Sequence, residues 1–559
     1  MRLRYPLKRS LVLLGIFAAL WFASLDCRRL VQPDEGRYAE IAREMVVSGD
    51  WLTPRLNGIK YFEKPPLQYW ATALAYLSFG KSEWSARFWT GLTGFLGVLV
   101  LGYGGAQLFG ARAGLFSALI LASCTYYALL GHINTLDMGL TFFMLLSLVA
   151  FLLAQVDHAT AAQNRIGMLT AWAAMALAVL SKGLVGIVLP GATLVLYALV
   201  ERDASLFKRL HPLNGLALFF AIAAPWFIQV SRANPEFAHF FFVHEHLQRF
   251  TSNVHGRVQP FWFFLPLLLF GVLPWLGLLP SALLQAWRKK TPQPRFSVTR
   301  FLLCFSAVIL VFFSASGSKL PAYILPLFPA LALMMGKRLA QQRNDSAQPA
   351  PAGSSLRAAF PILIPGLLSG AAYLAGLLAG GMADDAVERA LFRNFSYWLI
   401  VAAAVMIAGS LYYAWQFRRG RCDAAVIGFA FAALAAAQIA TCGYGTLAPS
   451  NSAHAMAQRI QPLLLPDVPI YSVGMYDQTL NFYLDRTVTL VDYSDELGFG
   501  LEQEPALGIA TLDAFRREWA AHPEAWAVMP PHVYASLQQS HFAMRLVARD
   551  TRRVIVRPS

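Results

Sequence analysis

Residues 31–70 read VQPDEGRYAEIAREMVVSGDWLTPRLNGIKYFEKPPLQYW. This stretch is far more polar than the sequence on either side of it. It gathers carboxylates, cations and aromatic rings, whereas the flanking sequence consists mainly of long apolar runs. A polar segment between apolar runs is typical of a loop at a membrane surface. We therefore expect apolar helices to hold this loop against the membrane face as a candidate functional site.

The composition places the chain among helical membrane proteins. Of its 559 residues, 57% are hydrophobic and only 14% are charged, whereas about 25% charged residues is ordinary for a soluble protein. Runs long enough to cross a bilayer predict about thirteen spans. We place them near 9–27, 85–109, 113–131, 137–154, 166–181, 184–200, 214–231, 261–287, 299–315, 320–336, 358–381, 395–416 and 424–442. The first run reads as an uncleaved helix.

The positive charges predict the orientation of the spans. The formal net charge is +15, and Lys and Arg in membrane proteins concentrate in cytoplasmic loops. Alternate loops are cationic near residues 202–209, 288–300, 337–357 and 418–421. With the N-terminus in the cytoplasm, an odd number of spans puts the C-terminus outside. No nucleic-acid-binding signature accompanies the charge, so we expect no nucleic-acid partner.

The polar segments outside the membrane predict two loops and a terminal domain. The loops cover residues 28–84 and 232–260, and the first contains two short helices, 38–47 and 66–79, in the interface plane. We assign residues 1–444 to a transmembrane domain and 445–559 to a small soluble α/β domain. Its expected strands are VPIYSVG, LNFYLDR, TVTLVDY, WAVMPP and RRVIVRP, with a helix ATLDAFRREWAAH capped by Thr511 or Asp513.

This C-terminal domain shows no catalytic constellation in its sequence, and we expect it to be a lid or a docking platform for the acceptor. The five cysteines of the chain also lack a functional pattern. They are scattered and form no CxxC pair, so the sequence supports neither a disulfide framework nor a zinc–thiolate site. They are Cys27, Cys124, Cys304, Cys422 and Cys442.

Asp34 and Glu35 open the first helix of the 28–84 loop. An Asp in this position often caps the helix, because its side chain accepts orphan backbone N–H groups. The alternative is that one carboxylate caps the helix and the other faces a substrate. The position after a membrane helix, followed by Arg37 and Tyr38, favours a functional role.

Three phrases in this stretch resemble a known family: the Asp34–Glu35 pair, GDWLTPRLNG at 49–58, and YFEKPPLQYW at 61–70. They are similar to the polyprenyl-phosphate-sugar-dependent membrane glycosyltransferases of the dolichyl-phosphate-mannose protein mannosyltransferase type. Within that family the chain most resembles the bacterial transferases that add 4-amino-4-deoxy-L-arabinose to lipid A.

The resemblance implies a GT-C fold, all-α in the membrane, with a periplasmic C-terminal domain. The implied donor is aminoarabinose on undecaprenyl phosphate, and the implied acceptor is a lipid A phosphate at the periplasmic face of the bacterial inner membrane. The implied role is lipopolysaccharide modification and polymyxin resistance. The family's required acidic residue matches Asp34, and its second acidic position matches Asp137 in HINTLDMG. We expect a monomer that also contacts membrane lipids.

The chemistry adds further candidates. Displacing a polyprenyl phosphate builds positive charge on the sugar and negative charge on the leaving phosphate, so cations should meet the phosphate and carboxylates the sugar. For the donor phosphate we predict Lys64, Arg249 and Tyr323. Lys182 and Lys319 are further candidates, with a snorkelling lysine at a helix end as the alternative. Arg37, Tyr38 and Tyr61 complete the substrate-binding set.

The acceptor decides what Asp34 does. A phosphate acceptor is already anionic and needs no general base, so Asp34 would pair with the sugar's ammonium group and stabilise the oxocarbenium-like state. A hydroxyl acceptor would need Asp34 as its base. Asp137 and Glu35 complete the candidate catalytic set. We expect Asp34, Lys64 and Arg249 to converge on one cavity.

One histidine cluster, His244-Glu245-His246, raises a metal hypothesis. Glu63 and His244 could together bind a divalent cation, most readily zinc, because imidazole and carboxylate are zinc ligands. The spacing matches no known zinc signature, and the alternative is a polar face on an interfacial helix.

Two rival functions remain open. One keeps the lipid-linked donor but transfers a hexose to a protein or another glycan. The other is a transporter or flippase for the lipid-linked sugar. Transporters commonly show inverted repeats and charges near the bilayer midplane. This chain shows no internal repeat, and its charges cluster outside the spans, which favours an enzyme.

Overall fold

The structure, a computed structural model, describes residues 7–248, 259–288, 295–342, 354–382, 386–493 and 495–559. The chain forms two compact units. The helical unit contains residues 1–25, 89–382 and 396–443. The loop–sheet unit contains residues 26–88, 383–395 and 444–559. Each unit is therefore assembled from segments that lie far apart in the sequence.

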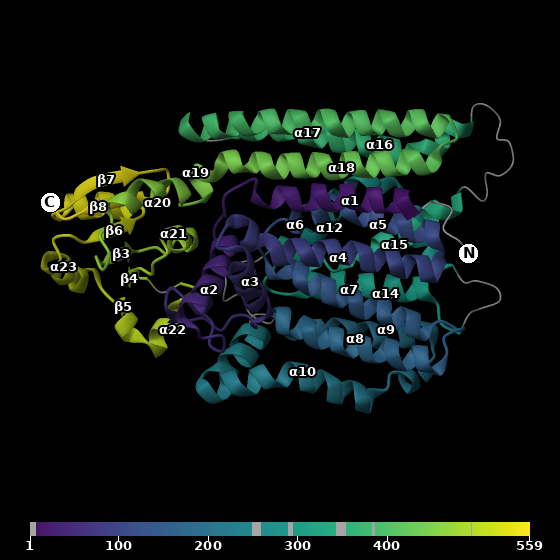
Figure 1. Cartoon of the computed structure of the whole chain (residues 1–559), viewed down its shortest axis with the longest axis horizontal. Coiled ribbons are helices and arrows are strands. Elements are labelled where there is room, and N and C mark those ends of the chain that lie inside the picture. Colours follow the sequence, from purple (N-terminus) through teal and green to yellow (C-terminus); the bar gives the residue numbers. More distant parts are fainter. Residues whose placement is uncertain (1–6, 249–258, 289–294, 343–353, 383–385, 494) are drawn as a thin grey trace. The chain divides into compact units, whose positions relative to one another are not determined.

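The helical unit consists of long apolar helices that run side by side (Figure 1). Its helices are α1 (Leu7–Ala23), α4 (Glu83–Phe109), α5 (Ala111–Ser123), α6 (Thr125–Leu130), α7 (Leu136–Gln155), α8 (Ala161–Lys182), α9 (Val185–Glu201), α10 (Pro212–Ala233), α12 (Phe264–Gly271), α13 (Leu279–Trp287), α14 (Val298–Ala315), α15 (Leu327–Gln342), α16 (Ser354–Ala375), α17 (Ala386–Arg418) and α18 (Cys422–Gly443). The first residues of α4 and α17 belong to the loop–sheet unit. A π-helical segment, η3 (His239–Gln248), follows α10.

Length and composition mark these helices as membrane spans. Among the described residues, eight helices are long and apolar enough to cross a membrane, or up to nine if the pair Phe261–Gly271 and Leu273–Trp287, bent by 91°, is one span. Three shorter apolar helices, Leu11–Asp26, Ala111–Ser123 and Val185–Glu201, coincide with further predicted spans. The prediction of an all-α polytopic membrane fold is confirmed, although several predicted spans are broken or short.

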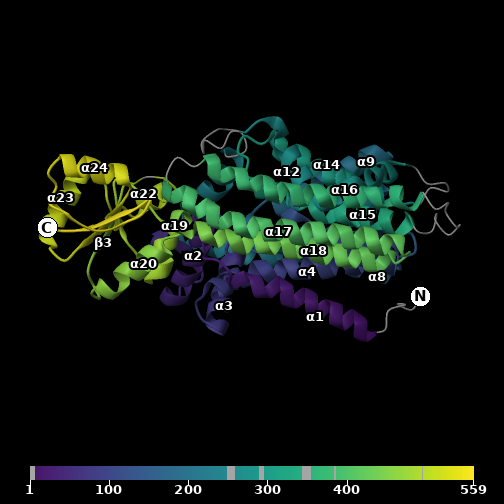
Figure 2. The same ribbon diagram turned by 90° about the horizontal axis from the view of Figure 1, so that it is seen from above.

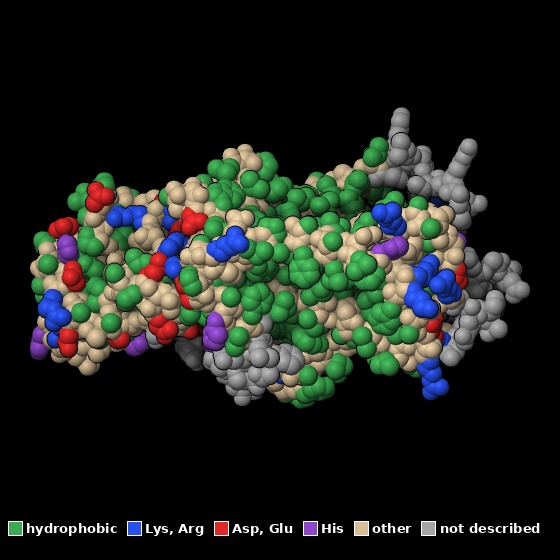
Figure 3. All heavy atoms as spheres, turned by 90° about the horizontal axis from the view of Figure 1, so that it is seen from below, with side chains coloured by type: hydrophobic (Ala, Val, Ile, Leu, Met, Phe, Trp, Pro, Cys, Tyr) green, Lys and Arg blue, Asp and Glu red, His purple; other side chains and the backbone are tan. Residues whose placement is uncertain are grey.

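The surface of the helical unit fits a lipid environment. In Figure 3 hydrophobic side chains cover most of the visible helical surface, and Lys and Arg side chains gather near one end of the helices. A protein in water rarely exposes so large a contiguous apolar surface. The helices therefore bury their apolar sides against one another and against lipid.

The loop–sheet unit is built on a mixed six-stranded sheet in the order β5-β4-β3-β6-β8-β7. Strands β3 (Ile470–Val473), β4 (Thr489–Val491), β5 (Gly508–Ile509) and β6 (Trp526–Met529) run parallel to one another. The β7 (Arg545–Arg549) and β8 (Val554–Arg557) pair is antiparallel, and β8 is antiparallel to β6. Figure 2 shows this sheet with helices beside it.

Helices and a small hairpin complete this unit. They are α2 (Asp34–Ser48), β1 (Arg55–Leu56), β2 (Ile59–Lys60), α3 (Leu67–Phe79), α19 (Ala448–Asn451), α20 (His454–Ile460), α21 (Gln478–Leu484), α22 (Gly498–Gln503), α23 (Leu512–Ala521) and α24 (Pro531–Gln539). Helix α2 packs on both α3 and α21. Phe515 and Trp519 from α23 pack with Tyr471 in the core over the sheet. Helix α2 of the first loop thus packs directly on α21, a helix of the C-terminal segment.

The local predictions are confirmed in most places. The two short loop helices exist as α2 and α3, and Thr511 caps α23 by accepting the N–H of Ala514. The prediction of a strand at LNFYLDR was wrong, because these residues form α21. Asp477 caps that helix by accepting the N–H groups of Thr479 and Leu480, and this cap outweighs the β-type composition. Strands β5 and β7 were not predicted.

The compact units follow contacts rather than chain order. The predicted division at residue 445 placed 28–84 in the transmembrane domain, whereas the loop–sheet unit joins residues 26–88 to 444–559. Arg55 bonds to both carboxylate oxygens of Glu504, at 2.9 and 3.0 Å. Asn57 donates its side-chain amide to Val488 O at 2.7 Å. These contacts join segments more than four hundred residues apart.

The cysteine prediction needs a correction. Cys27 and Cys442 are each disulfide-bonded, whereas Cys124, Cys304 and Cys422 are free. Neither cysteine belongs to a characteristic spacing, so no sequence pattern indicated its bonded state.

Candidate functional site

The two carboxylates at the start of α2 lie in different surroundings. Pro33 is the N-cap of the helix and makes no side-chain cap bond, so Asp34 is the first helical residue rather than the cap. The capping alternative is therefore not what the structure shows. Both carboxylates lie in the first turn, where the positive end of the helix dipole favours negative charge.

Glu35 is fully buried in an ion-pair network. Its carboxylate accepts from Arg28 Nη1 at 2.5 Å and from Arg87 Nε at 2.8 Å, and it also accepts the N–H of Val31 at 3.0 Å. Burial would raise the pKa of Glu35, but Arg28 and Arg87 hold it well below its usual range. Glu35 thus stays ionised between two arginines, and its catalytic role stays a prediction.

The side chain of Asp34 is exposed, whereas that of Glu35 is buried. Asp34 keeps 41% of its side-chain surface exposed, and its Oδ1 accepts from Arg37 Nη1 at 2.9 Å. Arg37 is itself buried, with 8% of its side chain exposed. A carboxylate held by a buried guanidinium is oriented but still reachable by a substrate.

A residue that sequence reasoning missed completes this loop cluster. Glu496 pairs with Arg37 Nη2 and also accepts a hydrogen bond from the amide of Gln478. Burial raises the pKa of Glu496, and the charge of Arg37 opposes that rise. The sequence showed no catalytic constellation after residue 445, yet Glu496 lies just before α22 and contacts the predicted site. The only available signal was an acidic pair, Asp495-Glu496, outside any strand.

Two tyrosines flank Arg37. Its guanidinium carbon lies 5.9 Å from the centre of the Tyr38 ring. The hydroxyl of Tyr61 is buried and has no hydrogen-bond partner in the described part of the chain. Burial raises the pKa of Tyr61, so its hydroxyl stays protonated and able to donate. An orphaned buried hydroxyl is expected where a polar ligand completes the bonding.

Glu63 and Lys64 follow β2 in the same unit. Lys64 Nζ donates to the backbone carbonyl of Glu63 at 2.7 Å and lies 4.0 Å from its carboxylate. Both side chains are mostly buried, with 17% and 13% exposed. The rigid Pro65-Pro66 pair follows, so the backbone that carries Lys64 has little freedom.

A second cluster belongs to the helical unit. Asp137, in the first turn of α7, accepts a hydrogen bond from Lys182 at the end of α8. Lys182 Nζ also lies 4.8 Å from the centre of the Tyr323 ring. The snorkelling alternative for Lys182 is therefore not observed, because its ammonium is paired inside the protein. Three of the predicted residues meet here.

Lys319 is buried in the same unit. It is 7% exposed, and its ammonium donates to Ser316 O, at the C-terminal end of α14, at 2.6 Å. It does not extend outward as a snorkelling lysine would. Its role in binding the donor phosphate stays a prediction.

Two further predictions are the convergence of three residues on one cavity and the zinc site. Arg249 lies outside the described residues, so the expected convergence of Asp34, Lys64 and Arg249 stays a prediction. His244 Nδ1 lies 3.8 Å from Glu245 Oε1 in the helical unit, while Glu63 belongs to the other unit. Within the described ranges no three His, Cys, Asp or Glu side chains are grouped to hold a metal. The zinc hypothesis stays a prediction.

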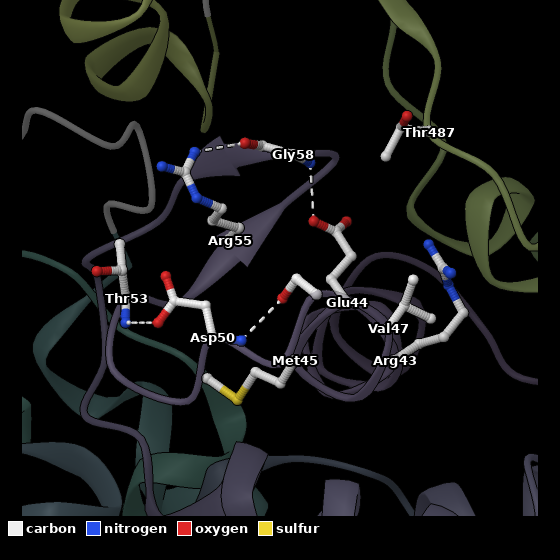
Figure 4. Close-up of a pocket in the computed structure, with 10 residues that line it drawn as sticks. Arg43, Glu44, Met45, Val47, Asp50, Thr53, Arg55, Gly58 and Thr487 are labelled. Atoms are coloured by element: carbon white, nitrogen blue, oxygen red, sulfur yellow. Dashed lines mark hydrogen bonds between the residues drawn. The ribbon is translucent and has the colours of Figure 1, made fainter.

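The loop–sheet unit also contains a cavity of about 200 Å³. Its lining residues are Arg43, Glu44, Met45, Val47, Ser48, Asp50, Thr53, Arg55, Gly58 and Thr487. Figure 4 shows that its polar side chains bond to neighbouring groups: Glu44 accepts the N–H of Gly58 at 2.8 Å, and Arg55 donates to Gly58 O at 2.6 Å. This cavity therefore offers few free groups to a ligand, and we assign no substrate to it.

Comparisons with known proteins cover the whole chain. Residues 63–228 match the family described as dolichyl-phosphate-mannose-protein mannosyltransferase, and residues 456–558 match the aminoarabinose transferase C-terminal domain. The undecaprenyl phosphate-alpha-4-amino-4-deoxy-L-arabinose arabinosyl transferase of Erwinia tasmaniensis is 31% identical over 528 residues, which is 92% of this chain and 91% of that protein. The second such transferase of Proteus mirabilis is 37% identical over 335 residues, 59% of each chain.

A solved structure is similar along nearly its entire length. The crystal structure of ArnT from Cupriavidus metallidurans bound to undecaprenyl phosphate has a TM-score of 0.91 and 38% sequence identity, with 99% of this chain and 98% of that chain covered. The same protein in the apo state gives a TM-score of 0.89 at 38% identity, over 98% of this chain and 97% of that chain. The similarity thus includes both the membrane helices and the C-terminal sheet.

Proposed function

This chain belongs to the family of undecaprenyl phosphate-α-4-amino-4-deoxy-L-arabinose arabinosyl transferases, and from that premise we propose that it transfers aminoarabinose to a phosphate group of lipid A. It is a multi-pass membrane glycosyltransferase with a lipid-linked donor. In our proposal the modified lipid A carries added positive charge, which weakens the binding of cationic peptides such as polymyxin.

The observation that carries this proposal is the state of Asp34. Its carboxylate pairs with Arg37 Nη1, and its side chain remains 41% exposed. Glu496 pairs with Nη2 of the same guanidinium. A preorganised carboxylate stabilises positive charge that develops at an anomeric carbon, without reorganising during the reaction. We assign Asp34 to the sugar, where it faces the ammonium group and the oxocarbenium-like state.

The phosphates need cations. When the bond from the anomeric carbon to the donor phosphate breaks, its electron pair stays on the phosphate oxygen, and the phosphate gains negative charge. Lys64, Arg249 and Tyr323 are our candidates to bind it, with Lys182 held in place by Asp137. A lipid A phosphate attacks as an anion, so the transfer needs no general base at that step.

We propose that the loop side of the membrane faces the periplasm, with the N-terminus in the cytoplasm. The disulfide-bonded states of Cys27 and Cys442 support this orientation, because disulfides form and persist in oxidising compartments such as the bacterial periplasm. The cationic loops near residues 202–209, 288–300, 337–357 and 418–421 fit a cytoplasmic location by the positive-inside rule.

A mass measurement tests the function. Purified protein is incubated with undecaprenyl phosphate-aminoarabinose and lipid A, and we expect lipid A to gain the mass of one aminoarabinose residue. Unmodified lipid A together with a glycosylated protein would favour the second candidate, a hydroxyl acceptor. Movement of the donor across the bilayer of vesicles that contain the protein, without sugar transfer, would favour a flippase.

The variant Asp34→Asn tests the role of the carboxylate. The transfer rate of this variant should be at least about 100-fold lower, because the substitution removes the charge that stabilises the transition state. Asp50→Asn is the matched control: Asp50 lies in the same loop and accepts the N–H groups of Leu52 and Thr53. Near-normal transfer by a folded Asp34→Asn variant would refute the assigned role.

A further inference from the structure

Lys319 is a buried cation that has no counter-ion among the described residues. It is 7% exposed, and its only hydrogen bond in the described part of the chain is the 2.6 Å bond to Ser316 O. No Asp or Glu within the described ranges lies at ion-pair distance from it. Buried lysines are rarely left uncompensated, because removing an ammonium from water is costly unless an anion replaces the water.

A second orphaned group lies next to it. The hydroxyl of Ser318 is buried and has no hydrogen-bond partner among the described residues, and Ser318 is 5% exposed. Its backbone carbonyl accepts from Ser316 Oγ at 3.1 Å, so the turn 316–319 is closed by its own hydrogen bonds. Buried hydroxyl groups are nearly always bonded, and an exception is expected where a ligand supplies the partner.

The charges of Asp137, Lys182 and Lys319 indicate which ligand fits the turn. Asp137 and Lys182 cancel each other as an ion pair, so neither offers net charge to an anion. Lys319 adds one positive charge. A sugar-carrying phosphodiester bears one negative charge, which this net charge matches. Tyr323 follows in the same segment, with its ring 4.8 Å from Lys182 Nζ.

We propose that the Ser316–Lys319 turn is a subsite for the phosphate of the lipid-linked donor, in which the Lys319 ammonium and the Ser318 hydroxyl bind the phosphate oxygens. This rests on the proposed function and deepens it. As the bond to the anomeric carbon breaks, its electron pair becomes a second negative charge on the departing phosphate. The new bond forms between the anomeric carbon and an acceptor phosphate oxygen. Lys319 binds the departing dianion more strongly than the diester, and this difference accelerates the reaction.

The test measures binding and turnover separately. Binding of undecaprenyl phosphate is followed by intrinsic tryptophan fluorescence of the full-length protein in detergent, and initial rates are recorded against donor concentration. We expect Lys319→Met to weaken binding at least about 10-fold and to lower kcat more than it raises KM. Ser318→Ala should weaken binding about 3-fold, and Lys319→Arg should stay near wild type.

Matched controls separate this role from simple loss of a buried group. Lys337→Met removes another buried lysine of the same unit, whose ammonium lies 4.8 Å from the Phe109 ring. Ser306→Ala removes a buried hydroxyl that bonds within α14, to Leu302 O at 2.8 Å. Both should bind undecaprenyl phosphate as wild type does. Binding of uncharged undecaprenol, and of lipid A, should not change in Lys319→Met.

Unchanged undecaprenyl phosphate binding and unchanged kcat in both Lys319→Met and Ser318→Ala would overturn the subsite. An equal loss in binding of lipid A would overturn its assignment to the donor. If Lys319→Met does not fold, Ser318→Ala decides alone. Failure of wild-type protein to glycosylate lipid A would instead contradict the proposed function, while the phosphate measurements would still stand.

Discussion

Asp34 and Glu35 show how one step along a helix separates two roles. A single residue turns the side-chain direction by about 100°. Glu35 therefore lies between Arg28 and Arg87 with no exposed side chain, whereas Asp34 stays 41% exposed. The buried carboxylate fixes the start of α2, and its neighbour is free to meet a substrate.

Glu496 should position Arg37, and through it Asp34. Glu496→Ala leaves a buried guanidinium with one partner fewer, and breaking a buried pair costs about 3–5 kcal/mol. We expect a transfer rate at least about 10-fold lower, and a smaller loss in Glu496→Gln, which keeps a hydrogen-bond acceptor. Steady-state kinetics and a thermal midpoint check this. Glu502→Ala, an exposed neighbour in α22, is the control, and an equal effect in both variants would contradict the role.

Glu44 should make stability depend on pH. Burial and the nearby Glu40 raise its pKa to about 8, above the unfolded value of about 4.3. A carboxyl whose pKa rises on folding favours the folded state only while it is protonated. That contribution is fully present below pH ~4.3 and is lost as the pH rises through about 8.

The thermal midpoint of the protein should therefore fall between pH 5 and pH 8.5. In Glu40→Gln the pKa of Glu44 should drop, because the neighbouring negative charge is gone, and the fall in midpoint should move to lower pH. Glu502→Gln should keep the wild-type profile. Identical profiles in wild type and Glu40→Gln would contradict the pairing of the two carboxyl groups.

At the same scale, sequence reasoning selected Asp34, Asp137, Lys182 and Tyr323 because their residue types and outer positions suit phosphate and sugar chemistry, and their roles stay predictions. It did not find Glu496, whose partner Arg37 lies more than four hundred residues away. For both Lys182 and Lys319 it left the snorkelling alternative open, since burial by neighbouring helices leaves no local pattern. Pairings of this kind depend on tertiary contacts, which local composition does not encode.

Among the elements, α2 depends on one small residue where it crosses α21. A Cβ on Gly36 would lie 2.7 Å from the backbone carbonyl of Gln478 and 2.7 Å from Thr479 Cγ2. The backbones of α2 and α21 can make room for this Cβ only if one of the two helices moves. The glycine in DEGRYAE therefore sets the distance between the two helices, and with it the position of the adjoining Asp34 and Arg37.

Gly36→Ala should push α2 away from α21. We expect a loss of about 1–3 kcal/mol in stability, typical of overpacking, together with a reduced transfer rate. Gly15→Ala is the control, because a Cβ there meets nothing within 4 Å. Thermal midpoints and transfer rates of both variants test this, and a Gly36→Ala protein with wild-type values would contradict the close crossing.

Elements were predictable where local chemistry is strong. Helix α23 follows from its 3.6-residue period and the Thr511 cap. The β1–β2 turn was not predicted, although its Asn57-Gly58 pair, with φ angles of 59° and 75°, is typical of a hairpin turn. The prediction of a strand at LNFYLDR was wrong because alternating apolar residues fit a strand as well as a helix. The bend of 91° between Phe261–Gly271 and Leu273–Trp287 interrupts a run that composition alone presents as one span.

For the whole molecule, hydropathy predicted the membrane fold but not the grouping of its parts. Residues 26–88 join the C-terminal segment through contacts such as Asn57 to Val488 O, at 2.7 Å. The first loop is thus part of a folded unit, and its polar residues are held by a sheet encoded at the other end of the chain.

A chain that ends at residue 444 tests this dependence. Without the sheet, residues 26–88 lose the partners of Arg55, Asn57 and Arg37. We expect these residues to become sensitive to protease in the shortened chain and transfer to be lost, whereas the full chain protects them. Equal protection in both chains would contradict a shared folded unit.

The oxidised state of Cys27 and Cys442 has a consequence for biogenesis. The cytosol keeps thiols reduced, so in the orientation we propose maturation finishes after export of the segments that carry them. Cell-free synthesis under reducing conditions should yield immature protein, and adding an oxidant with a disulfide isomerase should restore it. Hosts that lack a periplasmic thiol oxidase should accumulate less of the mature enzyme.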